Sequence, residues 1–261
     1  MAKSIAVIPD VQAKAGQDFT FLRDVGKFLV EKQPDYWIQL GDFLDFESLS
    51  SYDKGTKSYE GRRIVKDIDA GYEAMDALMG PLHEYNLTAK LNKKKQYHPE
   101  LHLTLGNHCD RLHRAINEDP KLDGLITVDD LPFAQHGWIV HPFLEVIQIE
   151  GICFSHYFTS GVMGRPVGNA KQLLAKKHMS CVQGHVQKMD ICTEYKADGS
   201  MLTGLFAGCC YIHDETYLGL QGNNHFRGIH MLYEVNNGEF HTHSVTLKYL
   251  QERYAKPNTL S

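Results

Sequence analysis

The sequence predicts an α/β domain, and three observations support this prediction. The N-terminal part alternates strand, helix and strand, which is the βαβ unit of a parallel sheet. The second half is rich in short strand signals separated by glycine and asparagine. At 261 residues and 43% hydrophobic content, the chain can bury one substantial core. We therefore expect a single domain over residues 1–254 and a frayed tail over residues 255–261.

The N-terminal unit begins with an apolar run at residues 4–9, which suits a strand that is buried on both faces. Over residues 19–30 the apolar side chains follow the spacing of an amphipathic helix, with Asp18 as the expected N-cap. Pro34 ends this helix, and residues 36–40 form the second predicted strand. The loops after the two strands should therefore meet at one edge of the sheet.

Residues 48–99 have a different character. Residues 48–60 are polar and show no clear period, whereas a long helical stripe of apolar residues begins after Arg62. We interpret this region as an insertion that lies over the core as a lid. Four side chains in its polar part either contact a base and a phosphate or belong to a surface loop, namely Tyr52, Lys54, Lys57 and Tyr59.

The remainder of the chain predicts more strand than helix. A strand over residues 101–105 precedes a helix over 111–118, and a second helix is expected over 168–178. Further strands are expected over residues 144–149, 151–155, 180–183, 201–206, 229–235 and 239–245. The run Asn236-Asn237-Gly238 predicts a tight hairpin between the last two of these strands.

Composition narrows the class of protein. The net charge of −5 argues against a basic face that grips long duplex DNA, but it leaves nucleotides and strand ends open as substrates. We see neither a signal peptide nor an apolar run near 18 residues, so we expect a cytoplasmic protein without a membrane segment. The six cysteines include no C-x-x-C pair, which favours reduced thiols.

Polar residues follow the predicted strands in order. These residues are Asp10, Asp42, Asn107, His108, His156 and His185. Loops at the carboxyl ends of neighbouring strands can bring such side chains to one point, which is what a metal site requires. The glycines before Asp42, Asn107 and His185 allow tight turns or a positive φ. Each residue alone is a weak signal, because a lone Asp after a strand often caps a helix, but the ordered set predicts a metal site.

The ordered motifs resemble those of the calcineurin-like metallophosphoesterase superfamily, whose signature is D-x-H, G-D-x-x-D, G-N-H-[D/E], H and G-H-x-H. Here the motifs are Asp10-Val11-Gln12, Gly41-Asp42-Phe43-Leu44-Asp45, Gly106-Asn107-His108-Cys109, His156 and Gly184-His185-Val186-Gln187. Residues 107–111 also resemble the G-N-H-x-D-R stretch of phage and bacterial members, which include nucleases and phosphodiesterases. The resemblance implies a four-layer αββα sandwich with a helical insertion.

The resemblance further implies a site with two divalent metal ions. Asp42 would bridge the ions, one of which would also bind Asn107, His156 and His185, and the other Asp10, Gln12 and Gln187. His108 would donate a proton to the leaving oxygen or stabilise the phosphoryl group, and Asp45 would orient His108. A hydroxide that bridges the ions would attack phosphorus in line.

Gln12 and Gln187 depart from the signature, since both stand where the family has histidine, and both belong to the same ion. Amide oxygens are harder ligands than imidazoles, so we expect Mn²⁺ first, with Mg²⁺, Ca²⁺, Zn²⁺, Ni²⁺ and Fe as further candidates. The alternatives to a site with two ions are an enzyme that binds one metal ion and a site that has lost its activity. The presence of Asp10, Asp45 and His108 speaks against decay.

Several other residues are candidates for substrate contact. Arg111 and Arg114 share one face of the helix after His108 and either form a solvated face or bind phosphate, with Arg111 the closer to His108. The loop after His156 contains Tyr157, Thr159 and Arg165, which either contact substrate or only accompany a turn of the chain.

We expect a metal-dependent phosphoesterase, and more specifically a phosphodiesterase that acts on a nucleotide or on a single-stranded or terminal nucleic-acid substrate. This preference rests on the long insertion at residues 48–99 and on the resemblance to nucleases. A phosphomonoesterase of proteins or small molecules is the alternative enzyme. A non-catalytic module that binds metal or nucleotide is the alternative from another class. Homodimers occur in this superfamily, although no feature of the sequence indicates one.

Overall fold

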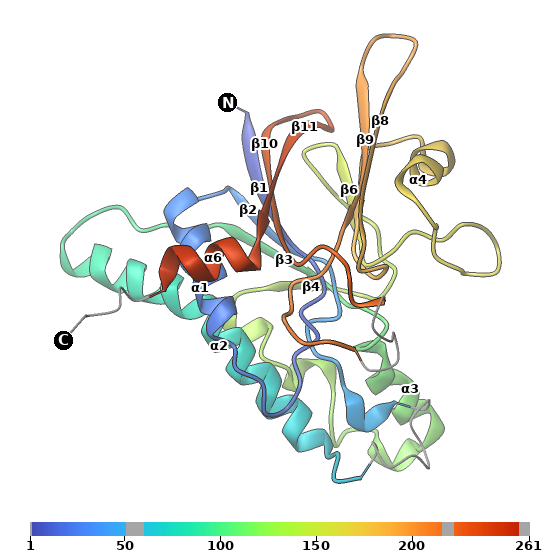
Figure 1. Ribbon diagram of the computed structural model, residues 1–261. Coiled ribbons are helices and arrows are strands. Elements are labelled where there is room, and N and C mark those ends of the chain that lie inside the picture. Colours follow the sequence, from blue (N-terminus) through green and yellow to red (C-terminus); the bar gives the residue numbers. More distant parts are fainter. Residues whose placement is uncertain (1, 51–59, 216–221, 256–261) are drawn as a thin grey trace.

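The structure, a computed structural model, describes residues 2–50, 60–215 and 222–255 and contains two mixed β-sheets flanked by helices (Figure 1). Within this part of the chain, the first sheet has the strand order β11-β10-β1-β2-β3-β4. Its strands are β1 (Lys3–Ile8), β2 (Tyr36–Gln39), β3 (Glu100–Thr104), β4 (Ile139–His141), β10 (Gly228–Asn236) and β11 (Glu239–Thr246). Strands β1 to β4 run parallel to one another, and β10 is antiparallel to both β1 and β11.

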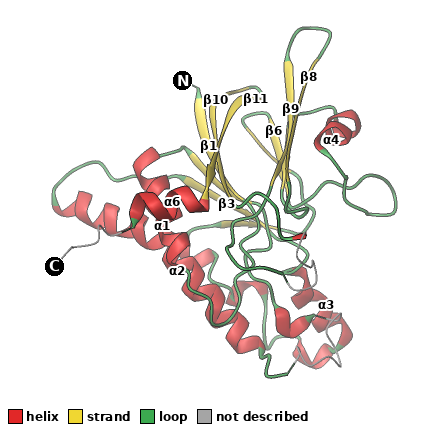
Figure 2. Ribbon diagram, viewed as in Figure 1, coloured by secondary structure: helices red, strands yellow, loops and turns green. Residues whose placement is uncertain are grey.

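The second sheet has the strand order β5-β6-β7-β9-β8. Its strands are β5 (Ile147–Ile149), β6 (Ile152–Ser155), β7 (Cys181–Gln183), β8 (Met189–Tyr195) and β9 (Met201–Ala207). The helices are α1 (Thr20–Lys32), α2 (Ile64–Leu91), α3 (Asp110–Glu118), α4 (Ala170–Lys177) and α6 (Leu247–Tyr254). Helices α1, α2 and α6 lie on the side of the first sheet, whereas α4 lies beside the second (Figure 2).

The apolar residues of β1 explain how the two sheets are held together. Ala6 and Ile8 belong to the hydrophobic cluster that includes the helices α1 and α2, whereas Ile5 and Val7 belong to a cluster shared with the second sheet. All four side chains are fully buried, which confirms the prediction of a strand buried on both faces. This arrangement is consistent with the sandwich that the sequence resemblance implied.

The long helical stripe predicted after Arg62 is helix α2, and it packs into the domain. Met75 and Leu78 are fully buried in the cluster that also contains α1. Gly26 of α1 permits this approach, because a Cβ atom there would lie 2.2 Å from the carbonyl oxygen of Leu78. The polar residues 51–59, with the predicted lid side chains Tyr52, Lys54, Lys57 and Tyr59, lie outside the described residues, so the lid stays a prediction.

The start of α1 and the turn of the last hairpin can be compared with the predictions from the local sequence. Asp18 is not the N-cap residue of α1, which is Phe19, but its carboxylate accepts a hydrogen bond of 2.8 Å from the amide of Thr20. The predicted hairpin is confirmed, because Asn237 and Gly238 have φ angles of 48° and 87°, as a tight two-residue turn requires. No range was predicted for strands β4 and β8 or for helix α6.

The predictions about membrane segments and about the cysteines can be compared with the structure. No helix among the described residues is long and apolar enough to cross a membrane. All six cysteines are free thiols, as the sequence predicted.

Candidate metal centre

The loops after β1, β2, β3, β6 and β7 meet at one edge of the two sheets. Three of these strands are parallel neighbours in the first sheet, and β6 and β7 are parallel neighbours in the second. Contacts between loops join the sheets: the amide of His185 donates to Oδ1 of Asp10 at 3.0 Å, and Nδ1 of His156 lies 2.7 Å from the carbonyl oxygen of Leu40. The predicted convergence of these loops is therefore present.

Asp42, His156 and His185 form a cluster that is able to hold a metal ion, since one ligand atom from each lies within 4.8 Å of the others. Oδ2 of Asp42 lies 3.2 Å from Nε2 of His156, and Oδ1 of Asn107 lies 2.9 Å from the same nitrogen. Asp42 and His156 are buried. The four residues that the sequence assigned to one ion and its bridge thus lie together.

The hydrogen bonds of His156 fix which of its nitrogens faces the cluster. Because the carbonyl oxygen of Leu40 can only accept, Nδ1 of His156 carries a hydrogen, and Nε2 points to Asp42. Burial opposes a charge on this ring, but the carboxylate of Asp42 outweighs burial and raises the pKa of His156 to about 9. Without an ion, the ring therefore keeps a proton at the position that a metal ion would take.

The pKa of His185 is shifted in the opposite direction from that of His156. Burial, reinforced by the neighbouring His156, lowers the pKa of His185 to about 4. The ring is consequently neutral at physiological pH, which is the form that ligates metals. The ring of Tyr157 lies beside it, with the ring centroids 4.7 Å apart.

The side chains assigned to the second ion include buried polar atoms without a hydrogen-bond partner among the described residues. These atoms are Oδ2 of Asp10 and both Oε1 and Nε2 of Gln12. Leaving such a group unpaired costs about 1–3 kcal/mol, so the geometry favours a ligand there. Oε1 of Gln187 accepts a hydrogen bond of 3.0 Å from the hydroxyl of Tyr211. Carboxylate and amide oxygens together fit a hard divalent cation.

The pKa of Asp10 is shifted by its burial and by the neighbouring charged groups of the cluster. Burial is the largest effect and raises the pKa of Asp10 to about 7, and the nearby carboxylate of Asp42 acts in the same direction. Two acidic groups are thus packed together away from water, which is an arrangement that a bound cation would stabilise.

The backbone at this edge differs from the sequence expectation. Tight turns or a positive φ were expected at the glycines, and of the three only Gly41 has a positive φ, of 93°. Instead, four of the residues that carry polar side chains adopt the left-handed conformation, namely Gln12, Asp42, His185 and Gln187, with φ between 47° and 65°. Non-glycine residues in this region cost about 1–2 kcal/mol each and cluster at functional sites.

Gly106 and Gly184 are needed for close approach rather than for φ. A Cβ atom at Gly106 would lie 2.0 Å from Oδ1 of Asp42, and one at Gly184 would lie 2.4 Å from Oδ1 of Asp10. Each glycine therefore leaves room for a carboxylate to sit against the backbone of the next loop. Close approach of a carboxylate is a requirement at these two glycines that the sequence did not indicate.

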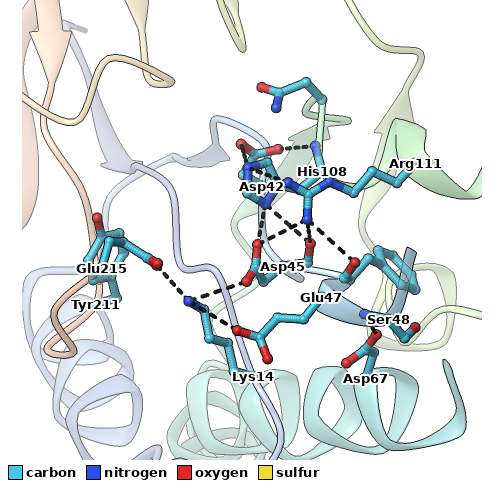
Figure 3. A network of polar contacts seen from close by, with 12 residues as sticks. Lys14, Asp42, Asp45, Glu47, Ser48, Asp67, His108, Arg111, Tyr211 and Glu215 are labelled. Carbon is cyan, nitrogen blue, oxygen red and sulfur yellow. Dashed lines mark hydrogen bonds and ion pairs between the residues drawn. The ribbon is translucent and has the colours of Figure 1, made fainter. Parts of the chain in front are cut away.

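His108 forms a pair with the buried Asp45 next to Asp42 of the cluster (Figure 3). Nδ1 of His108 contacts the carboxylate of Asp45, and Nε2 of His108 lies 3.8 Å from Oδ2 of Asp42. Burial opposes the charge on the ring, but Asp42 and Asp45 together raise the pKa of His108. Burial also opposes the Asp45 carboxylate, yet its bond to His108 holds the pKa of Asp45 well below the usual range.

Arg111 packs onto this pair instead of forming a solvated face. Its side chain is only 14% exposed, and Nη1 donates to the carbonyl oxygen of Asp45 at 2.9 Å. Nη2 lies 3.4 Å from Nε2 of His108. Arg114 is half-exposed and donates to the carbonyl oxygen of Asn107 at 2.9 Å. Arg111 therefore lies against His108, whereas Arg114 contacts the backbone of Asn107.

The loop after His156 divides into two parts. The ring of Tyr157 lies against the rings of both His156 and His185. Thr159 and Arg165 take part in a turn, in which the amide of Ser160 donates to the carbonyl oxygen of Arg165 at 2.7 Å. Within this loop, Tyr157 is the candidate that the structure places at the centre.

Sequence reasoning missed a second group of polar residues around the centre. Lys14 contacts Asp45 and Glu215, and Tyr211 contacts Gln187. Lys14 lies close to the motif of Asp10, which is the one signal that could have found it. Residues 209–215 carry no motif, and they reach the site through an isolated parallel bridge between Asp10 and Cys209, where the amide of Cys210 donates to the carbonyl oxygen of Asp10 at 2.7 Å.

Comparisons with known proteins give a distant likeness. No family model matches the chain, and no curated protein matches its sequence. Among solved structures, a metallophosphoesterase-like protein is similar over 94% of this chain and 99% of its own, with a TM-score of 0.38 and 11% identity. A likeness at this level implies nothing about the function of this chain.

Proposed function

We propose that this protein is a metal-dependent phosphoesterase of the calcineurin-like type that cleaves phosphodiesters of nucleotides or nucleic-acid ends. One observation carries the proposal: an imidazole paired with a buried carboxylate, His108 with Asp45, lies beside a cluster that can hold a metal ion. A proton donor next to a cation is what cleavage of a phosphoester with a poor leaving group requires.

The donor set fits two divalent ions. Asp42, Asn107, His156 and His185 would hold one, and Asp10, Gln12 and Gln187 would hold the other together with Asp42. Bound ions would neutralise the phosphate and lower the pKa of a water molecule. The amide and carboxylate oxygens of the second set favour Mn²⁺ over Zn²⁺.

The side chains of the protein would provide the proton transfer. The Nε2 proton of the His108 imidazolium passes to the leaving oxygen while the bond from phosphorus to that oxygen breaks, and the electron pair of the bond stays on the oxygen. A water molecule supplies the new oxygen on phosphorus and loses a proton to solvent, and solvent returns a proton to Nε2 of His108 after each cycle. Asp45 keeps its contact with Nδ1 of His108 throughout. Arg111 adds positive charge beside Nε2 of His108, where it would contact the phosphoryl group.

Tyr157 supports a substrate with a base. Its ring is half-buried beside His185, so one part of its surface is available to a planar group near the metal cluster. Bases of nucleotides stack on such rings regardless of sequence, and each stack contributes about 1–3 kcal/mol. A nucleotide or a strand end would therefore gain binding energy that a simple phosphate would not.

The test is hydrolysis by metal-stripped protein that is refilled with Mn²⁺, Mg²⁺, Ca²⁺, Zn²⁺ or Ni²⁺. We expect Mn²⁺-dependent cleavage of bis-p-nitrophenyl phosphate and of the dinucleotide thymidylyl-thymidine, with slower cleavage of p-nitrophenyl phosphate. His108→Ala should lower cleavage of the dinucleotide by about 10²–10⁴-fold, because its leaving group is an alcohol. Preference for the monoester with Zn²⁺ would indicate a phosphatase. Inactivity with every ion would indicate a binding module.

A further inference from the structure

Lys14 has an unusual position beside the site, since its ammonium group is surrounded by three carboxylates (Figure 3). Nζ lies 2.6 Å from Glu215, 3.3 Å from Asp45 and 3.4 Å from Glu47. The Lys14 side chain is only 13% exposed. A lysine so nearly buried needs a specific set of partners, because removing it would leave buried carboxylates without compensation.

The contact with Asp45 completes the fixation of that carboxylate. Oδ1 of Asp45 faces Nδ1 of His108, whereas Oδ2 faces Nζ of Lys14. Arg111 binds the carbonyl oxygen of Asp45 and thereby holds the backbone. With both oxygens occupied, the carboxylate has one orientation. Without Lys14, Oδ2 would lose its partner and the carboxylate could rotate away from His108.

Lys14 is itself held by a closed ring of hydrogen bonds. Glu215 contacts Nε2 of His213 at 2.8 Å, and Nδ1 of His213 lies 2.7 Å from Nε2 of Gln17. Oε1 of Gln17 accepts from the backbone amide of Lys14 at 3.1 Å. Because the amide nitrogen of Gln17 can only donate, Nδ1 of His213 accepts and Nε2 donates to Glu215. Both the backbone and the side chain of Lys14 are consequently anchored.

We propose that Lys14 is a positioning residue, which fixes Asp45 so that Asp45 holds His108 for proton transfer. The inference rests on the proposed function and extends it to a residue that touches neither metal nor substrate. It also assigns a role to the segment after β9, because Glu215 on that segment anchors Lys14. A purely structural lysine would instead lower stability or activity without regard to the leaving group.

The activity test compares Lys14→Met and Lys14→Arg on two Mn²⁺-dependent substrates. We expect Lys14→Met to lower kcat for thymidylyl-thymidine by about tenfold or more with little change in KM, because proton transfer to an alcohol is impaired. Bis-p-nitrophenyl phosphate, whose leaving group needs no proton, should be much less affected, and Lys14→Arg should recover most of the loss. Adding Lys14→Met to Asp45→Asn should cost little more, since both act on one contact. Equal losses on both substrates, or additive losses, would overturn the proposal.

Lys27→Met is the matched control. Lys27 forms a 2.8 Å ion pair with Asp24 on α1, and its ammonium group lies over the ring of Tyr254 on α6, so its loss should leave both activities unchanged.

A second measurement does not depend on activity. In metal-free protein with ¹⁵N-labelled histidine, the low-field Nδ1 proton of His108 is identified by its disappearance in His108→Ala. The resonance of this proton should shift or broaden in Lys14→Met and should return to its wild-type position in Lys14→Arg. In Glu215→Gln it should shift by a smaller amount. Glu215→Gln replaces Lys14→Met as the test variant if Lys14→Met does not fold. An unchanged resonance in both Lys14→Met and Glu215→Gln would refute the positioning role. A responsive resonance in a protein that cleaves no phosphoester would refute the proposed function alone.

Discussion

Nε2 of His156 lies 3.2 Å from Oδ2 of Asp42, and the two residues come from different sheets. Asp42 follows β2 of the first sheet, whereas His156 follows β6 of the second. Their contact joins the sheets at the edge where the other candidate ligands lie. A charged imidazole and a carboxylate occupy this position in the absence of an ion, so a metal ion must compete with a proton.

Metal binding should therefore release a proton from His156. Since the pKa of His156 is raised to about 9, we expect the affinity for Mn²⁺ to rise by about tenfold per pH unit between pH 7 and pH 9. Titration calorimetry in buffers with different ionisation enthalpies measures the released protons, and about one per ion is expected at pH 7. His156→Asn should remove most of the release, and the remainder would come from Asp10, whose pKa is raised to about 7. An affinity that stays constant over this range would contradict the arrangement.

The stability of the metal-free protein should fall as pH rises from 7 to 9. The folded state raises the pKa of His156 from 6.5 to about 9, so the stabilisation from the charged ring is complete below 6.5 and is lost as pH passes 9. The full stabilisation is about 3 kcal/mol, and about 2 kcal/mol of it should be lost between pH 7 and pH 9. Urea unfolding in the presence of a chelator at several pH values measures it. His156→Gln should flatten the dependence, and added Mn²⁺ should restore stability most at the upper end of the range.

Asp45→Asn should impair proton transfer without removing the metal cluster. The amide cannot hold the His108 imidazolium as a carboxylate does, so we expect kcat for thymidylyl-thymidine to fall by about 100-fold. Mn²⁺ affinity measured by calorimetry should change little. Asp35→Asn is the control, because Asp35 pairs with Lys3 at the amino ends of β1 and β2. If the variant lost metal binding in proportion to activity, Asp45 would act on the cluster instead.

Gly106→Ala should displace a metal ligand. The added Cβ would lie 2.0 Å from Oδ1 of Asp42, and the neighbouring backbone cannot move aside cheaply. We expect weaker Mn²⁺ binding by calorimetry and a lower melting temperature. Gly161→Ala is the matched control, because a Cβ there meets no atom within 4 Å and the φ of Gly161 is not positive. Similar metal affinities in the two variants would refute the close-approach argument.

The double substitution Gln12→His and Gln187→His should change the preferred ion. Imidazoles in place of amides soften the second set of ligands, so affinity for Zn²⁺ should rise relative to affinity for Mn²⁺. The two affinities are measured by competition with a chromophoric chelator. His98→Gln, on an exposed connection, is a control for a change in histidine content. An unchanged ratio of affinities would show that Gln12 and Gln187 do not bind the ion.

The sequence by itself determined most of the strands, the order of the motifs and the turn of the last hairpin. β1 was predictable because its apolar run has no polar side to expose, and the last hairpin because Asn237 and Gly238 suit positive φ angles. The convergence of Asp10 and Asp42 followed from the parallel order of strands, since such strands end at one edge. All of these features depend on periodicity or on turn chemistry, which are properties of neighbouring residues.

Only the tertiary structure decided how the side chains around His108 are held. Arg111 turns from its helix onto Asp45, and Lys14 meets Glu215, which lies 201 positions away. Such contacts have no period and no local motif, because they depend on which loops the packing of the two sheets brings together. The same packing made Gly106 a point of close approach. The local sequence determines the helices and strands. The distances between loops that are far apart in the sequence are fixed only when the two sheets pack together on their shared hydrophobic core.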